Sequence, residues 1–335
     1  MFLLPRMMRV VSDIDLRLDV FGQRLSMPVF VSPAGVHKLM HPEGECATAR
    51  ACAEAGTLMG VSQHATVSLE DVAAAAPRCA RWFQLYILKD RELTAGILRR
   101  SEKAGYTAIC LTVDSVRFGS READWRNNFN GLPPGVTLAN YPTQDGYNDR
   151  VKDAWDQNTE KLFDERATWS DIAWLKSLTS LPILVKGILT AQDAVSAVEA
   201  GASGVIVSNH GGRALDGSLS SIESLATVVK GFVHWARRTG PPVVLSRDRQ
   251  HTSPPLLTCV LNLAGGAVRP DGCKRPDILG LGRAQGNRCP QSAGTRYTFV
   301  GGGGGPRSIH HDNLEPGPIL PVCKVPMHLA PHQLV

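Results

Sequence analysis

The sequence predicts an α/β protein, a (β/α)8 TIM barrel that is incomplete at its C-terminal end. Two observations support this prediction. Short apolar segments rich in β-branched residues alternate with Ala-rich amphipathic segments, and the alternation stops after residue 245. Continuous apolar strands that alternate with helices indicate a parallel sheet whose two faces are both covered. Seven such units at this spacing fit a barrel better than an open sheet.

The expected elements follow one another along the first 245 residues. Strands are expected at 28–32, 58–62, 81–86, 108–114, 182–186, 205–208 and 242–245. Helices are expected at 43–55, from Ser68 onward, and at 91–104, 191–200 and 221–233. The helix that begins at Ser68 has Glu70 and Asp71 in its first turn, which is typical of a helix amino terminus. A closed barrel needs an eighth unit, which the sequence does not show.

Two segments break this rhythm. Residues 115–170 are polar and contain three prolines, and an insertion that follows a strand lies at the catalytic face of a barrel. We interpret this insertion as a mobile lid, with a surface loop as the alternative. Residues 246–335 are rich in Gly and Pro and show no helical period. We therefore expect a barrel domain at 1–245, followed by an aberrant, disordered tail at 246–335.

The composition narrows the class of protein. The net charge is +5, but the excess of Lys and Arg lies after residue 245, and no basic stripe with interleaved aromatic residues occurs. We therefore expect no nucleic-acid partner. No apolar run has the length of a membrane span, so no membrane partner is expected. The eight cysteines lack metal-like spacing, which predicts no metal site and a reducing compartment.

Polar residues stand where the predicted strands end. Because the carboxyl ends of parallel strands meet at one mouth of a barrel, we expect these side chains to lie together. They are Gln84 and Tyr86, Thr112 and Asp114, Lys186, and Ser208, Asn209 and His210, with Arg213 shortly after. One or two such residues could anchor loops, but this many at one mouth indicates an active site.

The most specific motif is S-N-H-G-G-R-A-L-D at 208–216, directly after an apolar run. A histidine on a rigid mount can act as a base near neutral pH. The two glycines allow a tight turn that brings Arg213 beside His210. The guanidinium of Arg213 is a planar fork suited to a carboxylate.

This motif resembles the active-site signature of the FMN-dependent α-hydroxyacid oxidases and dehydrogenases, glycolate-oxidase-like members in particular. The resemblance runs from about residue 5 to residue 245, with the motifs in the same order. They include P-R-M-M-R at 5–9, S-P-A-G at 32–35, H-P-E-G-E at 41–45, F-Q-L-Y at 83–86, L-T-V-D at 111–114, S-R-E-A-D-W-R-N at 120–127 and L-P-I-L-V-K-G at 181–187.

The resemblance implies a role for each matching residue. His210 is the base that takes a proton from the substrate, and Asp114 pairs with the imidazolium that forms. Arg213 and Arg121 hold the substrate carboxylate, and Tyr86 donates a hydrogen bond to the substrate. Lys186 lies beside the flavin ring and stabilises its reduced form. The other cofactor-binding residues implied are Pro33, Ala34, Gly35, Ser62, Gln84, Thr112 and Ser208.

The implied function is oxidation of a small (S)-2-hydroxyacid of glycolate or lactate type to the 2-oxoacid, with FMN as cofactor and O2 as the expected electron acceptor. Members of this family form tetramers, so the resemblance also implies a homo-oligomer. The family also implies a peroxisomal or else a cytoplasmic location, although the terminal residues 333–335 are not a peroxisomal targeting tripeptide.

Three departures from the family pattern stand out. The family has an N-terminal segment with a substrate-binding Tyr, which we do not find before Met1. His64 stands where the family often has a Trp. After residue 245 the Asp-Gly-Gly-x-Arg and Gly-Arg motifs that bind the FMN phosphate do not follow.

A shift of reading frame accounts for the third departure. Residues 287–296 can be back-translated so that, one base later, the codons read T-D-V-L-K-A-L-A-L-G, which resembles the family's seventh helix. We infer translated intron or aberrant sequence at about 246–286 and an out-of-frame remainder. The alternative to an enzyme is therefore a truncated, inactive family member unable to hold FMN. A type 2 isopentenyl-diphosphate isomerase is the alternative flavin barrel, and the His-Gly-Gly-Arg motif argues against it.

Overall fold

The computed structural model describes residues 7–8, 12, 14–116, 122–129, 131–142 and 162–239, together with the backbone of 256–258. The expected strand at 242–245 and most of the expected tail therefore lie outside the described residues. One compact unit spans Met1–Ala267 and contains every described residue.

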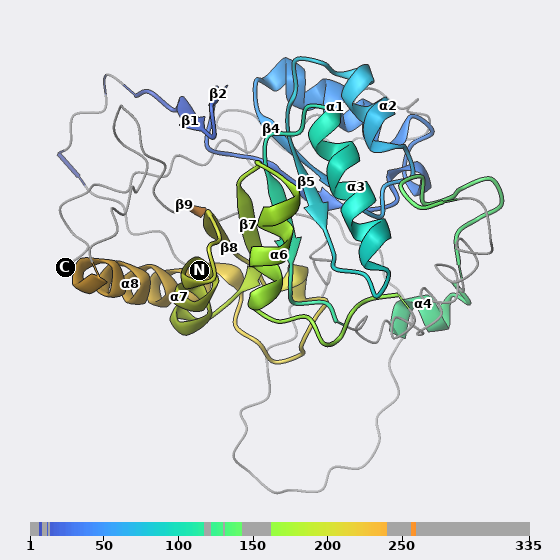
Figure 1. The fold of residues 1–335 in the computed structure, drawn as a ribbon. Coiled ribbons are helices and arrows are strands. Elements are labelled where there is room, and N and C mark those ends of the chain that lie inside the picture. Colours follow the sequence, from blue (N-terminus) through green and yellow to red (C-terminus); the bar gives the residue numbers. More distant parts are fainter. Residues whose placement is uncertain are drawn as a thin grey trace, which may run out of the picture. The chain divides into compact units, whose positions relative to one another are not determined.

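A parallel sheet forms the centre of this unit (Figure 1). Its seven strands stand in sequence order, each paired with the next. They are β3 (Val31–Ala34), β4 (Leu58–Ser62), β5 (Ala80–Leu85), β6 (Ile109–Thr112), β7 (Ile183–Ile188), β8 (Gly204–Val207) and β9 (Leu256–Thr258). Sequential parallel order is the arrangement of a barrel wall, and it confirms the predicted incomplete (β/α)8 barrel. Strand β9 lies beyond residue 245, within the segment expected to be a tail, and pairs with β8.

Helices connect these strands and lie along the outer face of the sheet (Figure 1). They are α1 (Gly44–Ala55), α2 (Leu69–Ala75), α3 (Arg91–Lys103), α6 (Ser170–Leu178), α7 (Ala191–Glu199) and α8 (Ser221–Thr239). Five of the six match predicted helices. Helix α6 was not predicted; in it Ile172 and Leu175, three residues apart, turn one side to the core.

Local signals explain why the helices begin where they do. The Ser68 hydroxyl accepts a hydrogen bond from the Asp71 backbone N–H at 3.1 Å, which caps α2 at the predicted residue. Asp90 and Thr190 cap α3 and α7 in the same way.

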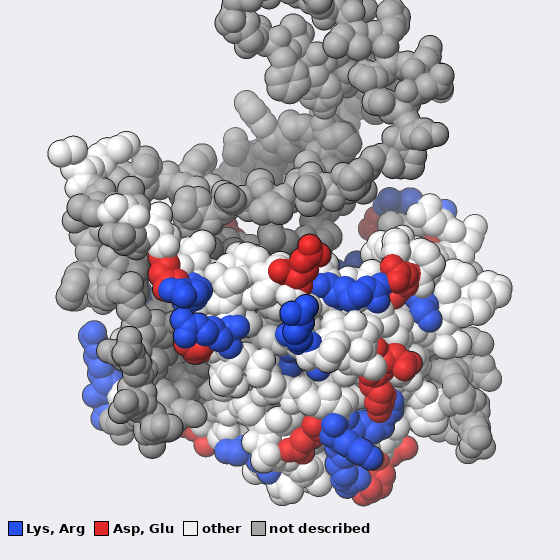
Figure 2. Space-filling model, turned by 90° about the horizontal axis from the view of Figure 1, so that it is seen from above, with Lys and Arg blue, Asp and Glu red and all other residues white. Residues whose placement is uncertain are grey.

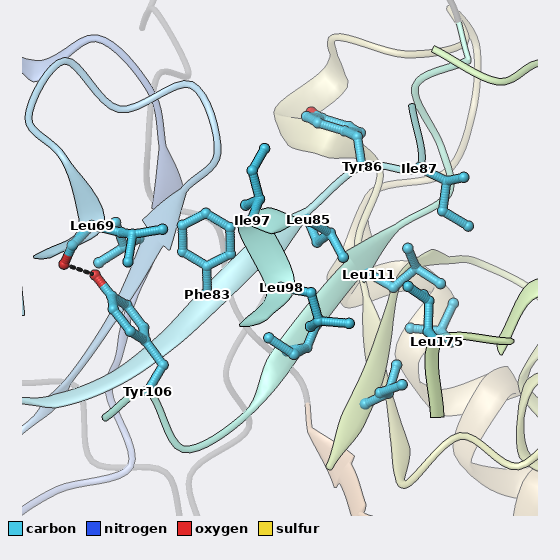
Figure 3. Close-up of a cluster of buried hydrophobic side chains, with 14 of the residues drawn as sticks. Leu69, Phe83, Leu85, Tyr86, Ile87, Ile97, Leu98, Tyr106, Leu111 and Leu175 are labelled. Carbon is cyan, nitrogen blue, oxygen red and sulfur yellow. Dashed lines mark hydrogen bonds between the residues drawn. The ribbon is translucent and has the colours of Figure 1, made fainter. Parts of the chain in front are cut away.

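The sheet separates two hydrophobic clusters. Phe83 and Leu85 point outward and pack with Ile97 and Leu98 of α3 (Figure 3). Trp82 points inward and belongs to the other cluster. The outer cluster includes Tyr106, whose hydroxyl donates a hydrogen bond to the Leu69 carbonyl at 3.0 Å. The alternation follows from the two-residue period of a strand, which sends successive side chains to opposite faces.

A short antiparallel hairpin, β1 (Leu18–Val20) and β2 (Gln23–Leu25), packs against the inner cluster through Val20 and Leu25. The hairpin was not predicted, because strands of three residues carry almost no periodic signal.

The insertion after β6 is partly fixed to the core. It contains the short helix α4 (Glu122–Arg126), and its described parts bury Leu138, Tyr141, Leu162 and Phe163. The backbone N–H of Ala139 donates to the Ala65 carbonyl at 3.0 Å. The remainder of the predicted lid lies outside the described residues.

Charges of both signs are interspersed on the face shown in Figure 2. Exposed pairs such as Arg100 with Glu70 contribute little to stability. None of the described helices is long and apolar enough to cross a membrane.

Candidate active site

Five polar residues lie on the inner face of the sheet at the carboxyl ends of its strands. Leu58, Trp82, Cys110, Leu184 and Ile206 belong to the inner cluster. The two-residue period therefore also turns Ser62, Gln84, Thr112, Lys186 and Ser208 inward, and all five are buried. Ser62 pairs with Gln84 and Thr112 with Lys186 across neighbouring strands. The structure thus brings together most of the residues predicted to bind the cofactor.

Several polar groups in this inner layer lack a partner among the described residues. Within the described part of the chain, Gln84 Nε2 and Thr112 Oγ1 are buried without a hydrogen bond. The other end of the Gln84 amide is fixed, because Oε1 accepts from Ser62 Oγ at 3.2 Å and from the Gln63 backbone N–H at 3.3 Å. Unpaired buried polar groups are costly, so this layer is suited to a polar ligand.

Lys186 adds a buried positive charge to the layer. Its side chain is 3% exposed and makes no ion pair or hydrogen bond with any described residue. Burial lowers the pKa of Lys186 below its ordinary value, and the nearby charge of Asp114 opposes that shift. A buried, unpaired ammonium favours a ligand that carries or develops negative charge.

His210 and Asp114 form the central pair of the site. His210 Nδ1 lies 2.7 Å from Asp114 Oδ1. Because a carboxylate only accepts hydrogen bonds, the proton belongs on Nδ1, and Nε2 is left with a free lone pair. Burial acts to raise the pKa of Asp114, but the hydrogen bond from His210 and the charge of Lys186 outweigh it and hold this pKa below its ordinary value. The carboxylate therefore stays charged beside the imidazole.

Ser115 is a second partner of the same imidazole, and no sequence motif had pointed to it. Its Oγ lies 2.9 Å from His210 Nδ1 and donates to Asp114 Oδ1 at 3.3 Å. The hydroxyl can thus share the Nδ1 proton while hydrogen-bonding the carboxylate, which restricts rotation of the ring.

The backbone that carries His210 is left-handed. His210 has φ of 58°, and Gly211 and Gly212 follow with φ of 68° and 75°. The two glycines tolerate this conformation, but a histidine adopts it at a cost in free energy. The Ser208 hydroxyl accepts from the His210 backbone N–H at 3.0 Å, and the Asn209 side chain accepts from that of Gly212 at 3.2 Å. These hydrogen bonds stabilise the tight turn at His210–Gly212, which the two glycines had led us to expect.

The other predicted residues are Pro33, Ala34 and Gly35 at the end of β3, and the two arginines Arg213 and Arg121. Pro33 and Ala34 end β3, and Gly35 follows them so closely against the β4–α2 loop that a Cβ would meet the His64 carbonyl oxygen at 2.9 Å. Arg213 is exposed just after the His210 turn. Arg121 lies outside the described residues.

Tyr86 stands just past β5 in a group of aromatic rings that contact one another. Its ring centroid lies 4.7 Å from that of Phe163 and 5.3 Å from that of His64. The Tyr86 backbone N–H donates to Gln63 Oε1 at 2.6 Å. Phe163 comes from the insertion, so the aromatic group around His64, the residue that stands where the family often has a Trp, is built partly by that segment.

Two further buried residues hold the loops around this site. Glu45, which is fully buried, accepts hydrogen bonds from the backbone N–H groups of His37, Thr66 and Val67 and from the Thr66 hydroxyl. It thereby joins the loops after β3 and β4. Glu45 belongs to the H-P-E-G-E motif at 41–45, which marked it as a family residue, but the motif does not indicate which groups Glu45 binds.

Asn140, also fully buried, joins the insertion to the β4–α2 loop. Its Oδ1 accepts from the Leu69 backbone N–H at 2.9 Å, and its Nδ2 donates to the carbonyls of Ser62 and Gln63 at 3.4 and 3.2 Å. The loop that Asn140 holds carries Gln63, which in turn fixes the backbone of Tyr86. No sequence signal predicted this role.

Comparison with known proteins identifies the family. The sequence profile of the FMN-dependent dehydrogenases matches residues 1–236. The chain belongs to this family. Among its relatives, glycolate oxidase of Spinacia oleracea is 48% identical over 228 residues, covering 68% of this chain and 61% of the spinach protein. Glycolate oxidase 5 of Oryza sativa subsp. japonica is 46% identical over 282 residues, 84% of this chain and 73% of the rice protein.

Solved structures of relatives agree with the fold. Mandelate oxidase matches with a TM-score of 0.61 and 42% identity over 69% of this chain and 63% of that chain. Mandelate oxidase with (S)-4-hydroxymandelic acid gives a TM-score of 0.63 at 41% identity over 69% of this chain and 65% of that chain. The chain thus spans about three-fifths of the length of the spinach protein, while the rice match extends beyond residue 245.

Proposed function

We propose that the protein oxidises a small (S)-2-hydroxyacid of glycolate or lactate type to the 2-oxoacid, with FMN as cofactor and O2 as electron acceptor. The observation that carries this proposal is the His210–Asp114 pair, 2.7 Å apart, at the end of the inner polar layer. A base with its charge-stabilising partner, beside buried donors that lack a partner among the described residues, supports oxidation of an α-hydroxyacid.

The inner layer fits a flavin. Gln84 Nε2 and Thr112 Oγ1 are donors without partners among the described residues, and the flavin ring offers carbonyl and nitrogen acceptors. Lys186 would place positive charge beside that ring, and Ser62 and Ser208 would line it. FMN, when bound, supplies the acceptor for two electrons from the substrate.

The chain's own residues would handle the proton and the carboxylate. His210 Nε2 takes the proton, and Asp114 stabilises the resulting imidazolium. Arg213 binds the substrate carboxylate, with Arg121 as its predicted companion. Tyr86 would orient the substrate by a hydrogen bond, and the neighbouring rings of His64 and Phe163 would exclude water from one side.

A spectroscopic experiment tests the proposal. The purified full chain is loaded with FMN, and its visible spectrum is recorded without oxygen before and after addition of glycolate or (S)-lactate. We expect a bound flavin band that bleaches with either acid, and a band that binds but does not bleach in His210→Gln. A chain that binds no FMN supports the inactive alternative instead. Bound flavin that neither acid bleaches would contradict the substrate class.

The family resemblance also supports a homo-oligomer and a peroxisomal or cytoplasmic location. Light scattering of the purified chain tests the first, and microscopy of a fluorescent fusion tests the second.

A further inference from the structure

An open groove lies between helices α2 and α3, on the outer side of the sheet. Its volume is about 530 Å³, a size typical of pockets that take small molecules. Each helix lines it with one face, because residues three and four apart lie side by side on a helix. The lining residues are Glu70, Ala73 and Ala74 of α2 and Arg100, Lys103 and Ala104 of α3. We call this feature the α2–α3 groove.

Arg81 reaches the groove from strand β5. It stands two residues before Phe83, so its side chain leaves the same outer face of the sheet. Arg81 is the second residue of β5, whereas the polar layer beside His210 lies at the carboxyl ends of the strands. The α2–α3 groove is therefore separate from the candidate active site. Arg81 lines the groove although its side chain is only 6% exposed.

The guanidinium of Arg81 is held in place by one of its three nitrogens. Nη1 donates hydrogen bonds to the carbonyls of Ala76 and Cys79, at 2.5 and 2.9 Å, and Cζ lies 5.6 Å from the centroid of the Tyr106 ring. Neither Nε nor Nη2 donates to any of the described residues, and Nε is enclosed. Capping the end of α2 thus uses Nη1 alone, and Nη2 is the nitrogen left to bind an occupant of the groove.

The charges that line the groove do not balance. Arg100 and Glu70 neutralise each other, because Nε and Nη2 of the arginine donate to the two carboxylate oxygens at 2.8 and 2.9 Å. These hydrogen bonds hold the pKa of Glu70 below its ordinary value, so the carboxylate stays charged. Arg81 and Lys103 form no ion pair with any carboxylate in the described part of the chain. Two positive charges therefore remain, one at the buried Arg81 and one at the exposed Lys103.

We propose that the α2–α3 groove is a binding site for a small organic phosphate, whose phosphate group accepts a hydrogen bond from Arg81 Nη2 and is attracted by Lys103. A phosphate monoester carries nearly two negative charges at neutral pH, which matches the two cations that lack a carboxylate partner among the described residues. Arginine suits phosphate oxygens through its planar fork of donors.

Two further observations favour this ligand class. A buried cation is costly without an anion beside it, so a bound phosphate would relieve the cost of burying Arg81. The alanines of the two walls offer apolar contact to the uncharged part of the ligand. The inference depends on the outer side of the sheet alone, so it stands or fails independently of the proposed reaction.

Titration calorimetry of the full chain tests the site, with glycerol 3-phosphate as the probe and glycerol as the probe without charge. We expect glycerol 3-phosphate to bind and glycerol not to bind. Raising the salt concentration should weaken the binding, because the attraction is largely between charges.

Three variants separate the groove from any other phosphate site of the chain. Lys103→Glu and Ala74→Glu place a negative charge on the two walls at exposed positions, and each should weaken binding about tenfold. Arg99→Glu is the matched control. It makes the same change of charge at an exposed position of α3 that does not line the groove, and it should leave the affinity within about twofold.

Circular dichroism shows whether each variant is folded, and having two wall variants guards against failure of one. Three results overturn the proposal: glycerol 3-phosphate fails to bind the unmodified chain, a folded wall variant binds it as tightly as the unmodified chain does, or Arg99→Glu weakens binding as much as Lys103→Glu.

Discussion

Gly187 lies directly against Asp114. A Cβ on Gly187 would come within 2.7 Å of both Cβ and Cγ of Asp114, and Gly187 itself has φ of 113°. It sits at the register shift between β7 and β8, one residue after Lys186. The bulge thus leaves room for the carboxylate that contacts His210, and it does so only with glycine.

Gly187→Ala should therefore displace Asp114 and destabilise the chain by about 3 kcal/mol, since strain and collision add. Urea denaturation measures the loss. Gly105→Ala is the matched control, because Gly105 has φ of 80° but no atom within 4 Å of the place that a Cβ would occupy. We expect only about 1 kcal/mol there. Equal losses in the two variants would show that Asp114 does not press on Gly187.

Asp114→Asn should slow flavin reduction by substrate by roughly a thousandfold or more, because the amide no longer stabilises the imidazolium or fixes the proton on Nδ1. Anaerobic rapid mixing of the FMN-loaded chain measures the rate. Bound flavin absorbance, recorded in the same sample, should be unchanged. A rate close to that of the unmodified chain would exclude Asp114 from the proton transfer.

Ser115→Ala should lower the same rate by about fivefold, the effect of losing one hydrogen bond of about 1 kcal/mol. Ser115→Thr keeps the hydroxyl and should restore the rate. The ring nitrogen resonances of His210 give a second measure, since only the alanine variant removes a partner of Nδ1. If threonine fails to rescue while the protein stays folded, the hydroxyl is not the relevant group.

Lys186→Met should stabilise the flavin-free chain by about 2 kcal/mol, because the variant replaces a buried cation that has no ion pair with the described residues by an apolar side chain. The lowered pKa of Lys186 decides whether the free energy of unfolding rises or falls with pH. The unfolded chain holds this proton more tightly, so the free energy of unfolding rises with pH until lysine's ordinary pKa of about 10.4. The advantage of the methionine variant should therefore shrink as the pH rises toward that value.

Lys89→Met, at an exposed lysine, is the control for this comparison. It should change neither the urea midpoint nor its pH dependence. A Lys186→Met chain less stable than the unmodified one would mean that the ammonium has a strong partner.

Asn140→Ala should cost about 3 kcal/mol, since it removes three buried hydrogen bonds and leaves the Leu69 N–H unpaired. It should also loosen the β4–α2 loop, which hydrogen–deuterium exchange of residues 62–69 would detect. Asn127→Ala changes an exposed asparagine of the same insertion and should leave both measurements unaltered. Unchanged exchange in the Asn140 variant would contradict its role as a clamp.

Local patterns made much of the fold predictable. The caps at Ser68, Asp90 and Thr190 and the apolar strands are signals that lie within a few residues of the elements they define. The inner polar layer followed from the same local information, because position along a strand decides which face a side chain occupies.

The contacts that refine the site could not be predicted in this way. Ser115 and His210 are hydrogen-bonded although they lie 95 residues apart in the sequence, and Asn140 and Leu69 although they lie 71 residues apart. Such pairs depend on how the strands are placed side by side, which the chain order of motifs does not reveal. Strand β9 escaped prediction for a related reason, since its three residues are defined by pairing with β8 rather than by their own pattern.

The left-handed backbone at His210 has a consequence for protein engineering. Glycine suits that conformation better, so His210→Gly should make the polypeptide more stable while removing the base. Any selection for thermal robustness alone would therefore drive this position toward glycine. If variants selected for stability still carry a histidine at position 210, the selection must also have favoured catalytic activity.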